Sequence, residues 1–232
     1  MRNRFERMYN PCGLRIPERL LKKDELKFGS RIECPKELLL DGYCTPVEDQ
    51  GAKPYCAAYS ASNFAESVLW RKNGYRTEIN PDPLYLHAKT IDGDPTGDGT
   101  YLECTLDALL EKGYFDRAAC KVKTFGGSVL GLGSNGLASV KNAIHRYGVC
   151  IAGFSITGEW FNPKGGVIRG TEKSPEGCHA VTLVGYDADG VLIMNSWGRD
   201  YAHEGKVYIT NKAFEDQFMY GAALTRCLDG ME

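Results

Sequence analysis

The hydrophobic pattern of this chain changes after Gly148, and that change limits the folds open to it. Three runs before this point carry apolar residues at helical spacing: residues 56–74, residues 102–113, and a run from Ser134 or Asn135 to Gly148. The stretch 125–136 is rich in glycine and is expected to be a loop. The first part of the chain is therefore expected to be mainly helical.

The second part has the pattern of a sheet. Short apolar runs at 149–154, 180–186 and 191–194 are typical of strands, and residues 187–190 supply the turn of a hairpin between the last two. A further strand is expected at 206–210. The pattern predicts an α+β fold, helical first and sheet-rich second, without an internal repeat.

Composition excludes several functional classes. The net charge of −2 gives the molecule no overall attraction to nucleic acid or to an anionic membrane. No apolar run approaches the roughly 20 residues that span a bilayer, and the basic N-terminus lacks the apolar stretch of a signal peptide. Nine cysteines without a C-x-x-C pair argue against a zinc ribbon. We expect no metal, no cofactor, and a cytoplasmic or non-classically secreted protein.

Residues 1–34 differ in charge from the rest of the chain. They hold nine basic and five acidic residues, a net charge of about +4. Because the whole chain carries −2, the remainder carries about −6. This segment is either a solvated arm or an arm that docks on the acidic body.

Cys56 stands at the predicted start of a helix, directly after Pro54 and Tyr55. The positive end of a helix dipole favours a thiolate and lowers the pKa of a thiol. The alternative is a buried structural cysteine, the usual role of this residue type. A nucleophilic thiol would also need a base and a group that orients the base.

His179 and Asn195 are the best candidates for these two groups. His179 begins one predicted strand, and Asn195 follows the second strand of the same hairpin, so pairing brings them together. An amide oxygen there would accept a hydrogen bond from one imidazole nitrogen and leave the other facing the thiol. The alternative is a pair of strand-end polar residues that only satisfy each other.

Three sequence blocks resemble the active-site segments of the papain-like cysteine proteases. They are residues 45–51 (Thr-Pro-Val-Glu-Asp-Gln-Gly) followed by Cys56, residues 178–186 around His179, and residues 195–198 (Asn-Ser-Trp-Gly). Their order and spacing match the family, and the resemblance covers roughly residue 35 to the C-terminus. It implies a helical lobe, mainly 45–147, and an antiparallel β-barrel-like lobe, mainly 148–232, with the active-site cleft between them.

The resemblance also assigns roles to single residues. It implies that Cys56 is the nucleophile, His179 the general base and acid, and Asn195 the residue that orients His179. Gln50 would help to bind the oxyanion, together with the backbone N–H of Cys56. Trp197 would cover the His179–Asn195 contact. The implied reaction is hydrolysis of peptide bonds through a thioester acyl-enzyme.

The substrate-binding residues are carried over more loosely. The resemblance places the following residues in or near the walls of the main specificity pocket and cleft: Gly99, Thr100, Tyr101, Ala152, Gly177, Ala180 and Trp197. Most are small or apolar, so we expect an aliphatic or aromatic side chain two residues before the cleaved bond.

Three departures from the family limit what can be carried over. Lys53 replaces a disulfide-forming cysteine, Ala57 replaces an aromatic residue, and Cys178 replaces an acid before the histidine. The alternatives are an amidase, isopeptidase or transpeptidase of the same chemistry, or an inactive binding protein of this fold. We expect a peptide or protein substrate and an intramolecular contact between residues 1–34 and the domain at 35–232. A docked arm far from the cleft and a mobile tail stay open.

Overall fold

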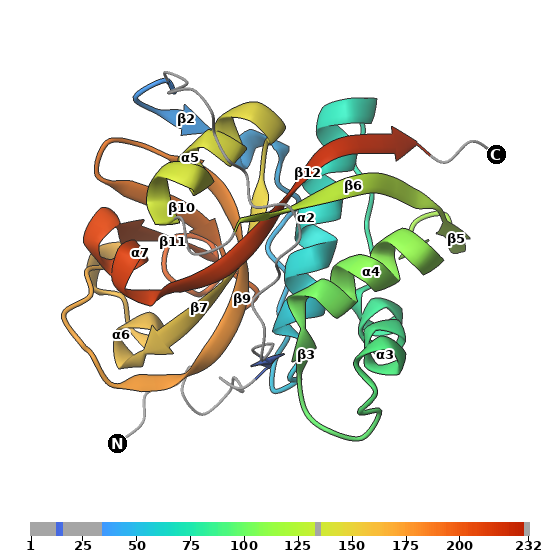
Figure 1. Cartoon of the computed structure of the whole chain (residues 1–232), viewed down its shortest axis with the longest axis horizontal. Helices are drawn as coiled ribbons and strands as arrows, with labels where there is room; N and C mark the ends of the chain where they lie inside the picture. The colour runs from blue at the N-terminus through green and yellow to red at the C-terminus, as the bar shows by residue number, and fades with distance from the viewer. Residues whose placement is uncertain (1–12, 16–33, 133–135, 230–232) are drawn as a thin grey trace.

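Helices and strands lie on opposite sides of the molecule in the computed structural model, which describes residues 13–15, 34–132 and 136–229 (Figure 1). Helices α2 (Cys56–Asn73), α3 (Pro81–Asp92) and α4 (Leu102–Lys112) pack against one another on one side. The sheet fills the other side, and α2 meets it along strand β9 (Pro175–Tyr186). The α+β class is confirmed.

Local signals in the sequence explain where the helices begin and end. Helix α2 ends at Gly74, whose φ of +76° and hydrogen bond to the Trp70 carbonyl form a left-handed cap. Helix α3 begins with Asn80 as its N-cap, accepting from the Asp82 N–H at 3.1 Å, and with Pro81 in its first turn. The helices predicted over 56–74 and 102–113 are thereby confirmed.

The main sheet has eight strands. Its order is β6-β12-β7-β9-β10-β11-β8, and β2 pairs separately with β9. The strand bounds are β2 (Leu38–Leu39), β6 (Phe125–Leu132), β7 (Cys150–Thr157), β8 (Val167–Ile168), β10 (Gly190–Met194), β11 (Lys206–Thr210) and β12 (Phe218–Asp229). All its pairs are antiparallel except β11 with β8. Within the described residues the sheet stays open, so the barrel-like lobe is not a closed barrel.

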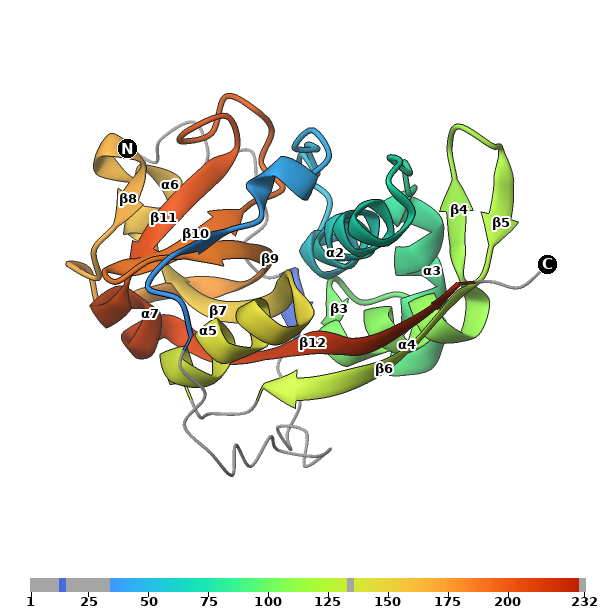
Figure 2. The same ribbon diagram turned by 90° about the horizontal axis from the view of Figure 1, so that it is seen from above.

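Strand β12 was not predicted. The expectation of a loop at 125–136 is also wrong, because residues 125–132 form strand β6, which pairs with β12. The first half of β12 pairs with β7 and its second half pairs with β6. The glycines of β6 weaken its intrinsic preference for a strand, but pairing with a long neighbour overrides that preference. Figure 2 shows β12 running from the sheet towards the helices, so it connects the two sides of the molecule.

Helix α5 (Gly136–Tyr147) packs on the sheet through β12, β9 and β7. Its predicted start at Ser134 or Asn135 lies outside the described residues. The remaining elements are β4 (Tyr114–Asp116), β5 (Lys121–Lys123), α6 (Gly158–Phe161), α7 (Asn211–Gln217) and the 3-10 turns η1 (Asp41–Tyr43) and η2 (Lys164–Gly166). The lobe boundaries inferred from the sequence stay a prediction.

A short piece of the N-terminal arm lies between the two sides of the molecule. Strand β1 (Leu14–Arg15) pairs in parallel with β3 (Thr100–Tyr101), which leads into α4. Figure 1 shows β1 beside β3 and the lower end of β9. Within the described part of the chain, no helix combines the length and apolar character needed to cross a bilayer.

Candidate active site

Cys56 is the first residue of α2 and is fully buried. Burial raises the pKa of its thiol to about 12, while backbone hydrogen bonds from Ala180, Ala57 and Cys56 itself act in the opposite direction. The helix start therefore favours the thiolate, as expected, but the loss of water outweighs it in this closed arrangement.

His179 and Asn195 are joined as the hairpin argument predicted. The His179 Nε2 and Asn195 Oδ1 atoms lie 2.7 Å apart, and the same oxygen accepts the Ser196 N–H at 2.8 Å. Both residues are fully buried. Burial lowers the pKa of His179 to about 4, and the hydrogen bond to Asn195 opposes that shift. The second ring nitrogen, Nδ1, is buried without a hydrogen bond among the described residues.

Aromatic rings enclose this pair. The Trp197 ring lies 4.7 Å from the His179 ring and stacks on Phe161 at 5.3 Å on its other side. Trp160 approaches the His179 ring edge-on at 6.3 Å. Trp197 itself has no exposed surface in this arm-covered structure, and its role in substrate binding stays a prediction.

Hydrogen bonds fix both polar atoms of the Gln50 side-chain amide. Its Oε1 accepts from the Ser196 hydroxyl at 2.6 Å, and its Nε2 donates to the Lys53 carbonyl at 2.9 Å. The Gln50 backbone N–H also donates to the Ser196 carbonyl at 2.9 Å. A side-chain amide has two N–H donors, so one remains for a ligand. Ser196, which the sequence analysis did not single out, therefore fixes the orientation of the Gln50 amide.

The N-terminal arm covers the Cys56 thiol at Gly13. A Cβ placed on Gly13 would lie only 2.8 Å from the Cys56 Sγ and 3.1 Å from the Pro54 carbonyl carbon. The Gly13 carbonyl accepts the Thr100 N–H at 3.3 Å. Only a residue without a side chain fits this position unless the surrounding atoms move.

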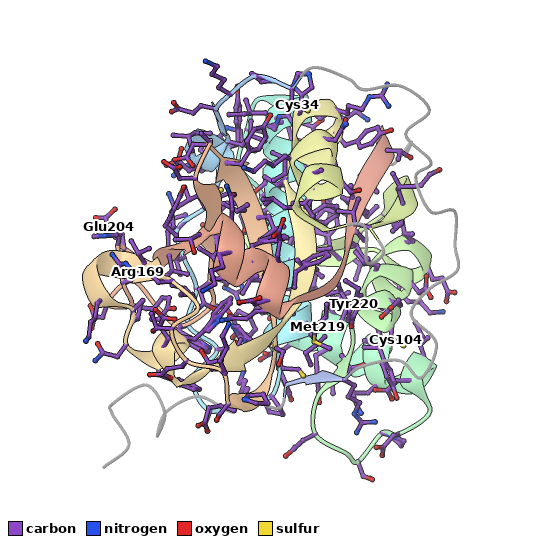
Figure 3. All side chains as sticks on the ribbon, turned by 60° about the vertical axis from the view of Figure 1, so that its left-hand side comes forward. Cys34, Cys104, Arg169, Glu204, Met219 and Tyr220 are labelled. Atoms are coloured by element: carbon purple, nitrogen blue, oxygen red, sulfur yellow. The ribbon has the colours of Figure 1, made fainter. Side chains whose placement is uncertain are left out.

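Leu14, the next residue of the arm, is 4% exposed and occupies a small apolar pocket. A Cβ on Gly153 would meet its Cδ2 at 2.6 Å and the Tyr220 ring at 3.2 Å. The Tyr220 hydroxyl donates to the Arg15 carbonyl at 3.2 Å. Figure 3 shows Tyr220 on β12, on the side of the molecule where β1 passes.

Some of the expected pocket residues lie beside the arm. Thr100 and Tyr101 pair with Leu14 and Arg15, and Ala180 pairs with Gly153, the residue that contacts Leu14. Its neighbour Ala152 points to the opposite face of β7 because side chains alternate along a strand. The assignment of Ala152 to the pocket stays a prediction, and Gly153 is the residue of β7 that contacts Leu14.

Gly99 lies between Asp98 and Thr100, two residues that hydrogen-bond the arm. The Gly99 carbonyl accepts from Lys89 at 3.0 Å, which fixes the start of β3. Gly177 lies opposite Ile156 at the start of β9. Tyr220 was missed because it comes from β12, which gave no clear sequence signal.

No metal site accompanies these residues. In the stretches that the structure describes, no group of three or more His, Cys, Asp or Glu side chains is placed to hold a metal ion. Seven cysteines of these stretches have described side chains, and all seven are free thiols: Cys34, Cys44, Cys56, Cys104, Cys120, Cys150 and Cys178.

Comparisons with known proteins find related sequences and related folds. The sequence pattern of the papain family cysteine proteases matches residues 112–221. Papaya proteinase 4 from Carica papaya is 30% identical over 187 residues, which cover 72% of this chain and 53% of that protein. Cathepsin K from Gallus gallus is 27% identical over 222 residues, which cover 85% of this chain and 66% of that protein. The chain spans about half the length of papaya proteinase 4 and about two thirds of cathepsin K.

Solved structures share the fold. Xylellain, a cysteine protease from Xylella fastidiosa, superposes with a TM-score of 0.75 at 16% identity, covering 92% of this chain and 95% of that one. The proCathepsin B of Trypanosoma congolense gives a TM-score of 0.74 at 17% identity, covering 92% and 86%. These matches give no support to the expected cytoplasmic location.

Proposed function

Because the chain belongs to the papain family of cysteine proteases, we propose that it is a cysteine endopeptidase with Cys56, His179 and Asn195 as its catalytic triad. The observation that carries the proposal is the buried His179–Asn195 hydrogen bond, which fixes one ring nitrogen and leaves Nδ1 available. Such a ring can hold the proton of a thiol placed beside it.

The reaction proceeds in two steps. The Cys56 sulfur attacks the carbonyl carbon of a peptide bond while His179 holds the thiol proton, and the C–N bond then breaks as His179 passes that proton to the leaving amine. A water molecule hydrolyses the resulting thioester and regenerates the thiol. The Gln50 Nε2 and the Cys56 N–H stabilise the negative oxygen in both steps, and one such donor contributes roughly 10²–10³ in rate.

The arm acts as an internal inhibitor in this proposal. Gly13 lies against the proposed nucleophile, Leu14 fills the pocket expected for the side chain two residues before the cleaved bond, and Arg15 lies one position further. A substrate would place its third residue before the cleaved bond at the position of Arg15 and its first at the position of Gly13. Its chain would thus run from the position of Arg15 to that of Gly13, whereas the arm runs from Gly13 to Arg15. Its backbone therefore has the opposite polarity and blocks the cleft without presenting a bond for cleavage.

Leu14 also supports the proposed selectivity. The pocket that holds it is walled by Thr100, Gly153 and Tyr220, and it suits an aliphatic side chain. We therefore expect substrates with leucine or a similar residue at this position.

A thiol-directed epoxide inhibitor tests the proposal directly. It should label Cys56 ahead of the other eight cysteines, and hydrolysis of a leucine-containing fluorogenic peptide should stop in Cys56→Ala. The matched control is Cys150→Ala, because Cys150 is equally buried but lies on β7 within the core. Hydrolysis that persists in Cys56→Ala would rule out this nucleophile.

A further inference from the structure

The loop between α3 and β3 holds the guanidinium group of Arg15. The Arg15 Nη2 lies 2.6 Å from Asp94 Oδ2, and its Nε donates to the Asp98 carbonyl at 3.0 Å. The side chains of Arg15 and Asp94 are 24% and 43% exposed. The loop thus offers a carboxylate and a carbonyl to one planar cation at the end of the cleft.

Asp94 is prepared for this contact by its own loop. Its Oδ1 accepts the Gly97 N–H at 3.0 Å, which leaves Oδ2 for the guanidinium. A Cβ on Gly97 would lie 2.1 Å from Asp94 Oδ2 and 2.3 Å from Arg15 Nη2. The glycine therefore provides the space in which the cation meets the carboxylate.

A buried ion pair fixes the position of this loop. Lys89 and Asp92 lie 2.8 Å apart with side chains 4% and 0% exposed. Asp92 also accepts from the Thr100 hydroxyl at 2.8 Å and from the Asp94 N–H at 2.9 Å. Since Lys89 balances the charge of Asp92, the charge that the loop presents to the cleft comes from Asp94, with Asp98 exposed beside it.

We propose that Asp94 and the Asp98 carbonyl form a subsite for a cationic side chain three residues before the cleaved bond. This inference rests on the proposed function and names its substrate class, peptides with arginine or lysine followed by an aliphatic residue. Arg15 lies one residue beyond Leu14 and opposite Tyr101, the place that the third side chain of a substrate would take. The backbone polarity differs between arm and substrate, but the site that receives the side chain is the same.

The test measures binding and not turnover, so it is independent of catalysis. The full chain carries Cys56→Ala to prevent cleavage, and Leu14→Asp with Arg15→Ala to displace the arm from the cleft, because an unpaired charge is unfavourable in the apolar pocket that Leu14 occupies. Two fluorescent peptides share leucine at the second position and differ only at the third, which is arginine or its neutral isostere citrulline. Fluorescence anisotropy gives the two dissociation constants.

The arginine peptide should bind about three- to tenfold more tightly, as expected for a partly exposed charge-assisted pair. This ratio should fall to about one when Asp94→Asn is added and should persist with Glu215→Gln, which removes an equal charge from exposed α7. Equal binding of the two peptides, binding of neither, or a ratio unchanged by Asp94→Asn would overturn the subsite. Failure of the proposed function would instead appear as absent hydrolysis and absent Cys56 labelling in a full chain that keeps Cys56 and carries the two arm-displacing substitutions.

Discussion

A side chain at position 13 has no room beside the Cys56 thiol. In Gly13→Val the new Cβ would lie 2.8 Å from the Cys56 Sγ, 3.1 Å from the Pro54 carbonyl carbon and 3.2 Å from its oxygen. Ordinary contacts of such atoms are about 3.5–4.0 Å, and overpacking of this kind costs about 1–3 kcal/mol. The arm can avoid this cost by leaving the cleft. The substitution should therefore lower the equilibrium constant between the covered and the open cleft by about 5- to 150-fold.

The assay is the initial rate of hydrolysis of a fluorogenic peptide with leucine two residues before the cleaved bond. If the arm blocks the cleft, Gly13→Val should be faster than the unmodified chain by a factor within that range, up to the rate of a chain without the arm. Gly42→Ala is the matched control, because a Cβ on Gly42 meets nothing within 4 Å and the residue lies in an exposed turn. Its rate should equal that of the unmodified chain.

Three results would refute the reasoning. An unchanged rate in Gly13→Val would mean that the arm does not limit access to Cys56. A slower rate with an unchanged melting temperature would mean that the glycine serves catalysis directly. An equal increase in Gly42→Ala would show that the effect is not specific to the contact with Cys56.

Four further predictions follow from the site and the core. Replacing Cys56 with alanine should abolish hydrolysis and epoxide labelling, as measured by rate and by mass spectrometry of labelled peptides. His179→Ala should slow alkylation of the thiol far more at acidic than at alkaline pH if the uncovered site holds a thiolate–imidazolium pair; an equal effect at both would exclude the pair. A chain beginning near Ile32 should hydrolyse peptide faster than the full chain, and high salt should narrow the difference because salt screens exposed charge pairs; equal rates at both salt concentrations would mean that the arm is no inhibitor. Burial raises the pKa of Glu66 to about 8 from 4.5, with hydrogen bonds from Thr45 and the Ile79 N–H opposing. The folded chain therefore retains a proton on Glu66 at pH values where the unfolded chain releases it. The resulting contribution of Glu66 to the free energy of unfolding, on the order of a few kcal/mol, is complete below about pH 4.5 and is lost as the pH rises through about 8. Urea unfolding of Glu66→Gln should show a flatter dependence of the free energy of unfolding on pH, and an unchanged slope would contradict the shift.

The predictable part of the fold was the part with strong local patterns. Helix α2 follows from apolar residues at helical spacing and ends at a glycine, and the β9–β10 hairpin follows from two apolar runs around a turn. These two elements bring Cys56 and the His179–Asn195 pair to the junction of helices and sheet. The proposal of the triad and of Gln50 rests in addition on the resemblance of the blocks at 45–56, 178–186 and 195–198 to the active-site segments of papain-like cysteine proteases.

The missed parts depend on contacts between distant segments. The glycines of β6 give no strand signal, and only the neighbouring β12 makes that segment extended. Strand β1 has two residues, too few for any periodicity to be detected. Tyr220 reaches Arg15 across 205 positions of sequence, a distance that no local pattern spans. Tertiary pairing decided each of these features.

Covalent attachment of the arm has a consequence for how this protein responds to dilution. An inhibitor on a separate chain dissociates as the solution is diluted, whereas a tethered one acts at a local concentration that its linker sets, of millimolar order for short flexible linkers. Specific activity of the full chain should thus be the same at nanomolar and micromolar protein. A peptide that carries the Leu14 and Arg15 side chains would compete with the arm only when it approaches that local concentration.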